Sequence, residues 1–169
     1  EIIEAKKIFN YKYSQLKILI HPNSYVHGIV KFKNGLTKML IHDTSMKIPI
    51  FNSFYSNFEK KIKTNDLDLN LLNNLNFKDV DSDKFPVSKI LKKMPNKDSL
   101  FETVIVSAND KLVDLFLKKK ISFTDISFFL LKIIEMHEFQ KFKKINAKDV
   151  DQIVNLSDYV SLKIDNLTI

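Results

Sequence analysis

Residues 20–50, IHPNSYVHGIVKFKNGLTKMLIHDTSMKIPI, decide the fold that the sequence predicts. Two runs rich in strand-forming residues, 25–33 and 36–42, lie on either side of Asn34-Gly35. This pair accepts the positive φ angles of a two-residue turn between antiparallel strands. The stretch therefore predicts a β-hairpin.

A third candidate strand, residues 16–20, comes just before the hairpin. It ends at His21-Pro22, because proline has no N–H for a ladder and pushes the residue before it toward extended geometry. Residues 1–10 carry apolar side chains at helical spacing and predict the end of a helix that leads into the sheet. We therefore expect three neighbouring strands with a helix before them.

The rest of the chain is expected to be mainly helical. Residues 43–59 predict a short extended stretch and then a helical turn, and the polar residues 64–83 predict a long connector. Amphipathic helices are expected near residues 87–94, 99–116, 122–134 and 146–156. The predicted fold class is α+β: a small, mainly antiparallel sheet with a hairpin and a flanking helix, joined by a long linker to a C-terminal helical bundle.

Two of these helices begin with a capping-box pattern. Ser99 is followed three residues later by Glu102, and Ser122 by Asp125. In such a box the Ser side chain and the acidic side chain each accept a hydrogen bond from the backbone of the first turn. We expect both boxes to form.

Composition limits the class of protein. The chain has 169 residues, a mass of 19.8 kDa and 44% apolar residues, enough for one sizeable core or two small ones. It has no cysteine, which excludes disulfides and thiolate metal sites and fits a reducing compartment. No apolar run approaches the roughly 18 residues of a membrane span. We expect a globular protein that does not enter a membrane.

The formal charge of +7 raises the question of nucleic acid. All 27 basic residues are lysine, however, and nucleic-acid readers usually exploit the guanidinium fork of arginine. A bias in codon usage explains the abundance of Lys, Asn and Ile better. We therefore expect no nucleic-acid partner.

Several motifs occur in a recognisable order. They are EIIEA at 1–5, IHPNSYVH at 20–27, TSMKIPI at 44–50, DKFP at 83–86 and SANDKLVDLFLKKKISFTDIS at 107–127. In this order and spacing, the chain resembles the 1-deoxy-D-xylulose 5-phosphate reductoisomerase family up to about Phe139. It departs from the family where Thr44, Ser45 and Lys47 replace the residues around Met46 in a Pro-Asp-Met-Arg run, and in lacking a tryptophan shortly after that run.

The resemblance implies an NADPH-dependent enzyme that converts 1-deoxy-D-xylulose 5-phosphate to 2-C-methyl-D-erythritol 4-phosphate in isoprenoid biosynthesis. Residues 1–63 would form the C-terminal part of its catalytic domain. Residues 64–84 would be a linker, and residues 85–169 would be its C-terminal helical domain. The chain has only two glycines, so it has no G-x-G-x-x-G turn for NADPH, and it begins without methionine. We expect the N-terminal half to be missing and this fragment to be inactive alone.

The resemblance also implies binding residues and partners. Glu1 matches a glutamate that completes a carboxylate site for Mg²⁺ or Mn²⁺, Ser24 and His27 match residues near the sugar-phosphate substrate, and Met46 matches a methionine beside the nicotinamide. Glu1 would also contact substrate through the metal, and none of these residues is expected to be a catalytic acid or base. The whole enzyme would be a homodimer of the bacterial cytoplasm or of a plastid.

The histidines allow a second prediction from spacing alone. His21 and His27 are six residues apart, so on an unbroken strand both would point to one side, although Pro22 interrupts the run. Two histidines without a third ligand are more often core or surface residues than metal ligands. By spacing alone, both roles stay open.

Two other functions compete with the enzyme. One is a binding or assembly module that keeps the fold without catalysis, favoured by the replacements around Met46. The other is a basic nucleic-acid module, which would bind arbitrary DNA at low salt.

Overall fold

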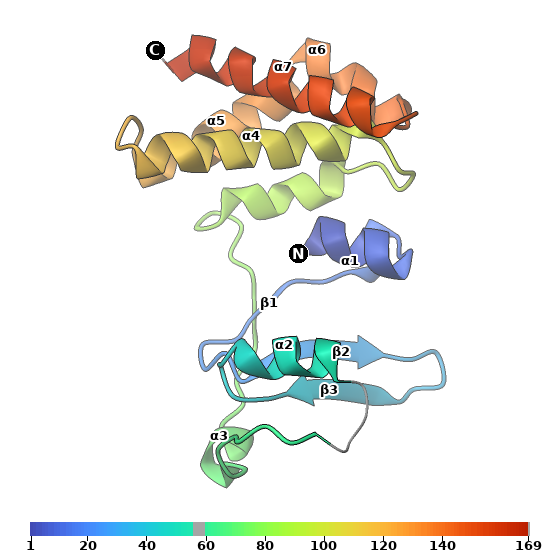
Figure 1. Cartoon of the computed structure of the whole chain (residues 1–169), viewed down its shortest axis with the longest axis vertical. Helices are drawn as coiled ribbons and strands as arrows, with labels where there is room; N and C mark the ends of the chain where they lie inside the picture. Colours follow the sequence, from blue (N-terminus) through green and yellow to red (C-terminus); the bar gives the residue numbers. More distant parts are fainter. Residues whose placement is uncertain (56–59, 169) are drawn as a thin grey trace. The chain divides into compact units, whose positions relative to one another are not determined.

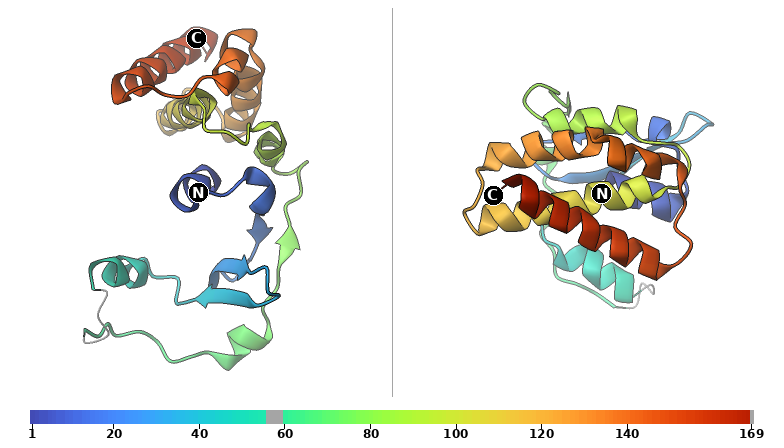
Figure 2. Two further views of the ribbon diagram at one scale, coloured as in Figure 1. Left: turned by 90° about the vertical axis from the view of Figure 1, so that its right-hand side faces the viewer. Right: turned by 90° about the horizontal axis from the view of Figure 1, so that it is seen from above.

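Helix α4 (Leu100–Leu117) forms the centre of the hydrophobic core in the computed structural model, which describes residues 1–55 and 60–168. It packs against α5 (Phe123–Glu135) on one side and α7 (Val150–Thr168) on another (Figure 1). Figure 2 shows the same three helices from above, in its right-hand view. The largest fully buried side chains are Phe101, Phe139, Leu100, Leu112, Leu130, Ile133, Ile134, Ile164, Val104 and Val160.

The chain divides into two compact units. The first contains Glu1–Lys17 and Asp81–Ile169, and the second contains Ile18–Val80. The first is helical and the second holds the strands, so the predicted α+β class is confirmed. The predicted division into residues 1–63, 64–84 and 85–169 refers to domains of the family rather than to these two compact units. That division stays a prediction.

Around α4, the first unit contains shorter elements: α1 (Ile2–Phe9), the 3-10 helix η1 (Tyr13–Gln15), the 3-10 helix η2 (Pro86–Lys93), α6 (His137–Gln140) and the 3-10 helix η3 (Lys141–Lys144). The predicted helix at the start is confirmed as α1, which ends at Asn10 in the left-handed region with φ 53°. The predicted α-helix near residues 87–94 is a 3-10 helix instead. No described helix is long and apolar enough to cross a membrane.

Only one of the two capping boxes forms. The Ser122 hydroxyl accepts a hydrogen bond from the Asp125 N–H, and the Asp125 carboxylate accepts one from the Ser122 N–H at 2.8 Å. Hydrogen bonding to the Ser122 side chain, and then to the Ser122 backbone N–H, lowers the pKa of the Asp125 carboxylate. The box predicted at Ser99 is wrong, because the Ser99 hydroxyl makes no cap bond and Glu102 bonds to side chains outside α4.

The hairpin of the second unit is confirmed. Strands β2 (Val26–Lys31) and β3 (Thr37–Ile41) pair antiparallel (Figure 1). The predicted two-residue turn is wrong: Phe32 N–H donates to the Leu36 carbonyl at 2.8 Å, so three residues form the loop. Within that loop, Gly35 has a positive φ of 88°, where a glycine avoids the strain of a side chain.

The three neighbouring strands that we predicted do not form. Strand β1 has only Leu19–Ile20, and it pairs with β4 (Lys78–Asp79) rather than with the hairpin, as the left view of Figure 2 shows. The predicted connector therefore contains β4, and also α3 (Leu69–Asn73). The helical turn predicted within 43–59 is α2 (Lys47–Phe54), while residues 56–59 lie outside the described residues.

Candidate functional site

Helix α1 carries Glu1 at its first turn. The Ala5 N–H donates to the Glu1 carbonyl at 2.7 Å, so the backbone of Glu1 is held by the helix. The Glu1 side chain is fully exposed. Glu4 lies one turn along, and its side chain is also exposed. The start of α1 thus presents two carboxylates to solvent.

A charged network joins α1 and η1 to the start of α4. The Tyr13 hydroxyl donates to Glu102 Oε1 at 2.5 Å, and Lys6 Nζ lies 3.2 Å from the same oxygen. Lys7 Nζ lies 2.8 Å from Glu102 Oε2 and 2.9 Å from Asp98 Oδ1. Lys6 also pairs with Asp98. Lys6 and Glu102 are 4% and 3% exposed, whereas Lys7 and Asp98 reach solvent, so the ion network is buried at its centre and open at its edge.

Burial and these partners shift the pKa values of the network. Burial, and then the hydrogen bond to Glu102, raises the pKa of Tyr13 well above its usual range. Burial alone would lower the pKa of Lys7, but its bonds to Glu102 and Asp98 outweigh that effect and raise the pKa. The bonds from Lys6 and Lys7 lower the pKa of Asp98. The phenol therefore stays protonated and the lysine stays charged at neutral pH.

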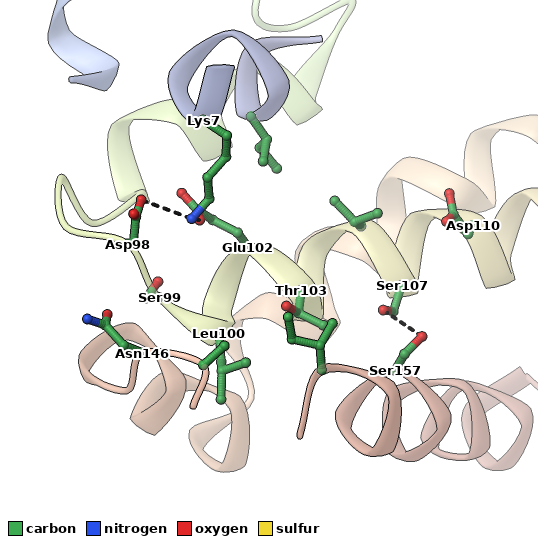
Figure 3. Close-up of a pocket in the computed structure, with 14 residues that line it drawn as sticks. Lys7, Asp98, Ser99, Leu100, Glu102, Thr103, Ser107, Asp110, Asn146 and Ser157 are labelled. Atoms are coloured by element: carbon green, nitrogen blue, oxygen red, sulfur yellow. Dashed lines mark hydrogen bonds and ion pairs between the residues drawn. The ribbon is translucent and has the colours of Figure 1, made fainter. Parts of the chain in front are cut away.

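A cavity of about 620 Å³ lies beside this network in the first unit (Figure 3). Lys7, Asp98 and Glu102 are at one end, and the Ser107 hydroxyl donates to Ser157 Oγ at 2.9 Å farther along α4. Ser99 also lines the cavity, and its hydroxyl has no hydrogen-bond partner among the described residues. The cavity mixes carboxylates, hydroxyls and apolar side chains, and its geometry alone selects no ligand.

His27 sits at a β-bulge. The ladder pairs Val26 with Ile41 and then Gly28 with Leu40, so His27 is the extra residue, and a bulge redirects such a side chain. Its ring stacks on His42 with the centroids 3.6 Å apart and the planes at 6°.

The backbone sets the tautomers of both rings. His27 Nε2 lies 3.1 Å from the His42 carbonyl and His42 Nδ1 lies 2.5 Å from the Asp43 carbonyl. Carbonyls only accept, so each of these ring nitrogens carries a hydrogen. His27 Nδ1 is left as an acceptor.

His21 does not join His27. A turn follows it, because the Ser24 N–H donates to the His21 carbonyl at 3.1 Å, and so no unbroken strand connects the two histidines. His21 stacks on Phe77 instead, at 4.8 Å between centroids, and its Nδ1 donates to the Asn76 carbonyl at 2.9 Å. Its contacts are those of a structural residue near the β1–β4 pair.

Ser24 and Met46 are both exposed on the second unit. Ser24 has a positive φ of 50°, which places it at the corner of the turn before β2. Met46 is 67% exposed at the residue that precedes α2, so it does not fill a core gap. The structure thus pairs His27 with His42, while within residues 1–55 and 60–168 no side-chain hydrogen bond or ring contact joins Ser24 or Met46 to His27. Glu1 belongs to the other unit.

Comparison with known proteins shows the family. Residues 42–161 match the model of the DXP reductoisomerase C-terminal domain. The chain belongs to that family. Over its full 169 residues, this member of the DXP reductoisomerase family is 61% identical to a 1-deoxy-D-xylulose 5-phosphate reductoisomerase of Pelagibacter ubique. It is 32% identical to another from a Sulfurihydrogenibium species, over 96% of the chain.

Solved structures give the same result. A crystal structure of DOX-P reductoisomerase with fosmidomycin and magnesium is 27% identical, has a TM-score of 0.81, and matches 99% of this chain but 44% of its own. One with NADPH, fosmidomycin and magnesium has a TM-score of 0.83 at 27% identity, with 99% and 42% covered. The chain likewise spans 44% of the Pelagibacter ubique relative. It therefore corresponds to less than half of the DXP reductoisomerases that it matches.

The donor set of the chain suits only part of a magnesium site. Mg²⁺ prefers carboxylate oxygens, and Glu1 offers one that is exposed. Among residues 1–55 and 60–168, no group of three or more His, Cys, Asp or Glu side chains could hold a metal ion. Glu1 alone offers one carboxylate ligand, and its role at a metal stays a prediction.

Sequence reasoning missed the charged network and the histidine stack. Glu102 follows Ser99 by three residues, and this spacing led to the capping-box prediction. The sequence did offer a signal, since Glu102 lies between the apolar residues Phe101 and Val104 of a predicted amphipathic helix, and the structure shows that Glu102 is buried. A buried carboxylate requires cationic or hydrogen-bonding partners from elsewhere in the chain.

Proposed function

We propose that this chain is the C-terminal part of an NADPH-dependent reductoisomerase that acts on 1-deoxy-D-xylulose 5-phosphate and forms 2-C-methyl-D-erythritol 4-phosphate. The observation that carries the proposal is the 61% identity to the Pelagibacter ubique enzyme over the whole chain. Support comes from the fold, which is similar to that of a DOX-P reductoisomerase with NADPH, fosmidomycin and magnesium. Homodimer formation and the cellular compartment stay predictions.

Glu1 would hold Mg²⁺ or Mn²⁺ with one carboxylate oxygen. A bound divalent ion of this kind supplies Lewis-acid polarisation of the oxygens that it contacts. The chain contributes the position of this ligand: α1 holds the Glu1 backbone through the Ala5 N–H, while the side chain extends into solvent. Two further acidic ligands would have to come from residues outside this chain.

The second unit would provide contacts to substrate and nucleotide. His27 is oriented by the His42 carbonyl and ring, which leaves its Nδ1 to accept a hydrogen bond from a substrate hydroxyl. Ser24 lies at an exposed turn, where its hydroxyl can donate a hydrogen bond to a phosphate or hydroxyl oxygen. Met46 offers an exposed apolar side chain suited to the flat face of a nicotinamide ring.

The isolated chain is expected to have no turnover. It has two glycines, Gly28 and Gly35, both in or beside the hairpin, and so no glycine-rich turn for a dinucleotide pyrophosphate. Addition of substrate, NADPH and Mn²⁺ should produce no loss of NADPH absorbance.

A chimaera tests the proposal. The 169 residues replace the matching part of the Pelagibacter ubique enzyme, and NADPH oxidation is followed with substrate and Mn²⁺. The proposal predicts turnover within about tenfold of the parent enzyme, because this chain would supply Glu1 and the proposed substrate contacts while the rest of the chimaera would supply the other metal ligands. A folded chimaera without turnover would instead support the non-catalytic module.

A further inference from the structure

The buried network links the helix that carries Glu1 to the helix at the centre of the core. Lys6 and Lys7 come from α1, Tyr13 follows in η1, and Glu102 belongs to the first turn of α4. Figure 3 shows Lys7 reaching from α1 toward Glu102 and Asp98. The contacts therefore join residues 89 positions or more apart in the sequence.

The apolar contacts and the polar contacts of α1 restrain its movement in different ways. Ile2 and Ile3 pack against the hydrophobic core, a contact that allows the helix to slide or rotate. The hydrogen bond from the Tyr13 hydroxyl to Glu102 Oε1 is directional, and Lys6 and Lys7 add ion pairs to Glu102 Oε1 and Oε2. Together these contacts restrain the rotation and the height of α1 on α4.

This restraint reaches Glu1 through the helix itself. Glu1 and Lys6 are separated by less than two helical turns, and the Ala5 N–H holds the Glu1 carbonyl at 2.7 Å. A short helix moves as a rigid body, so a change in the angle at Lys6 moves the Glu1 backbone with it.

We propose that Glu102 is a positioning residue for Glu1: through Lys6, Lys7 and Tyr13 it sets the orientation of α1 and so the place of the proposed metal ligand. This inference rests on the proposed function for its consequence in catalysis, but not for the link between α4 and α1. It assigns the C-terminal helical bundle a role at the metal site without any contact to metal or substrate.

An ion network suits this role better than an apolar contact would. Burying the charges of Lys6 and Glu102 has a desolvation cost that offsets much of their attraction, so such a network adds little net stability. Its bonds do select one arrangement over neighbouring ones, since any shift of α1 would leave a buried charge unpaired.

The link is tested in the 169-residue chain by amide hydrogen exchange of α1. Glu102→Gln keeps the shape of the side chain and removes its charge, and Tyr13→Phe removes one hydrogen bond only. We expect the Ala5 amide and its neighbours in α1 to exchange about tenfold faster in E102Q and about threefold faster in Y13F. Asp165→Asn breaks the ion pair between Lys111 and Asp165, at 2.8 Å between α4 and α7, and is the matched control.

The consequence for the metal is tested in the chimaera. E102Q and Y13F should raise the Mn²⁺ concentration for half-maximal rate by about threefold or more, with KM for NADPH unchanged. D165N should change neither quantity, because its ion pair has no contact with α1.

Hydrogen exchange tests the link between Glu102 and α1, and the Mn²⁺ requirement of the chimaera tests the positioning of Glu1. Equal exchange rates of α1 in E102Q, Y13F and the unmodified chain would overturn the link, as would an equal increase in D165N. Faster exchange in α1 with an unchanged Mn²⁺ requirement would overturn the positioning role. A chimaera that has no activity before any substitution counts against the proposed function, while the exchange rates still decide the link.

Discussion

The rings of His27 and His42 stack almost in parallel across the β2–β3 ladder, with centroids 3.6 Å apart and planes at 6°. His27 occupies the bulge, and its Nε2 donates to the backbone carbonyl of the same His42. His42 thus orients the plane of the His27 ring by stacking and favours the His27 tautomer that has its hydrogen on Nε2. The proposed contact of His27 with a substrate hydroxyl would need such support, because an unsupported ring would sample several rotamers.

Replacement of His42 by alanine should loosen the hairpin while the backbone carbonyl stays. The lost ring contact is worth about 0.5–1.5 kcal/mol, so amides of β2 and β3 should exchange about two- to tenfold faster. NMR-detected hydrogen exchange of the isolated chain measures this. His42→Phe keeps a stacking ring and is the control, and equal exchange in the alanine and phenylalanine variants would count against the stack as a support.

Stability should fall at alkaline pH because of Tyr13. Its folded pKa is raised by burial and by Glu102, whereas an unfolded tyrosine ionises near pH 10. The Tyr13 contribution is therefore fully present below about pH 10 and is lost as the pH rises above that value.

Urea unfolding between pH 8 and 11 checks this prediction. Y13F should be destabilised by about 1.5 kcal/mol at pH 8, and its stability should depend less on pH above 10 than that of the unmodified chain. Tyr11, which is 41% exposed, gives the control Tyr11→Phe, expected to keep the unmodified pH dependence. Parallel curves for Y13F and the unmodified chain would contradict the assignment.

The two serines that precede α4 and α5 should respond differently to the same substitution. Ser122→Ala removes a formed cap and should lower the free energy of unfolding by about 1 kcal/mol. Ser99→Ala removes a buried hydroxyl that has no partner among the described residues, and its effect should lie within about 0.5 kcal/mol of zero or be stabilising. Thermal unfolding of both variants measures the difference, and a larger loss for Ser99→Ala would refute it.

The hairpin and the bundle could be predicted because their signals are local. Two runs rich in strand-forming residues on either side of Asn34-Gly35 predict β2 and β3, and the apolar stripe from Phe101 to Leu115 predicts α4. The β1–β4 pair could not be predicted, because each strand has two residues and the register joins Leu19 to Asp79 far along the chain. Two residues are too few to show the alternation of apolar and polar side chains that predicts a strand.

The failed capping box shows how tertiary contacts override a local motif. Ser99 with Glu102 and Ser122 with Asp125 have the same spacing, yet only the second pair forms a box. The Glu102 carboxylate contacts Tyr13, Lys6 and Lys7, which lie about 90 residues earlier in the sequence. A motif search over a few neighbouring residues cannot detect such distant partners. The site residues Glu1, Ser24, His27 and Met46 came from family resemblance, and their roles stay predictions.

Substitution of the proposed metal ligand tests the central claim most directly. Glu1→Gln and Glu4→Gln are compared in the chimaera by Mn²⁺ binding, measured by electron paramagnetic resonance, and by turnover. Glu4 lies one turn from Glu1 on the same exposed helix and is the matched control. The account predicts a loss of about hundredfold or more in Mn²⁺ affinity for Glu1→Gln and a change within about twofold for Glu4→Gln. Unchanged Mn²⁺ affinity in Glu1→Gln would contradict it.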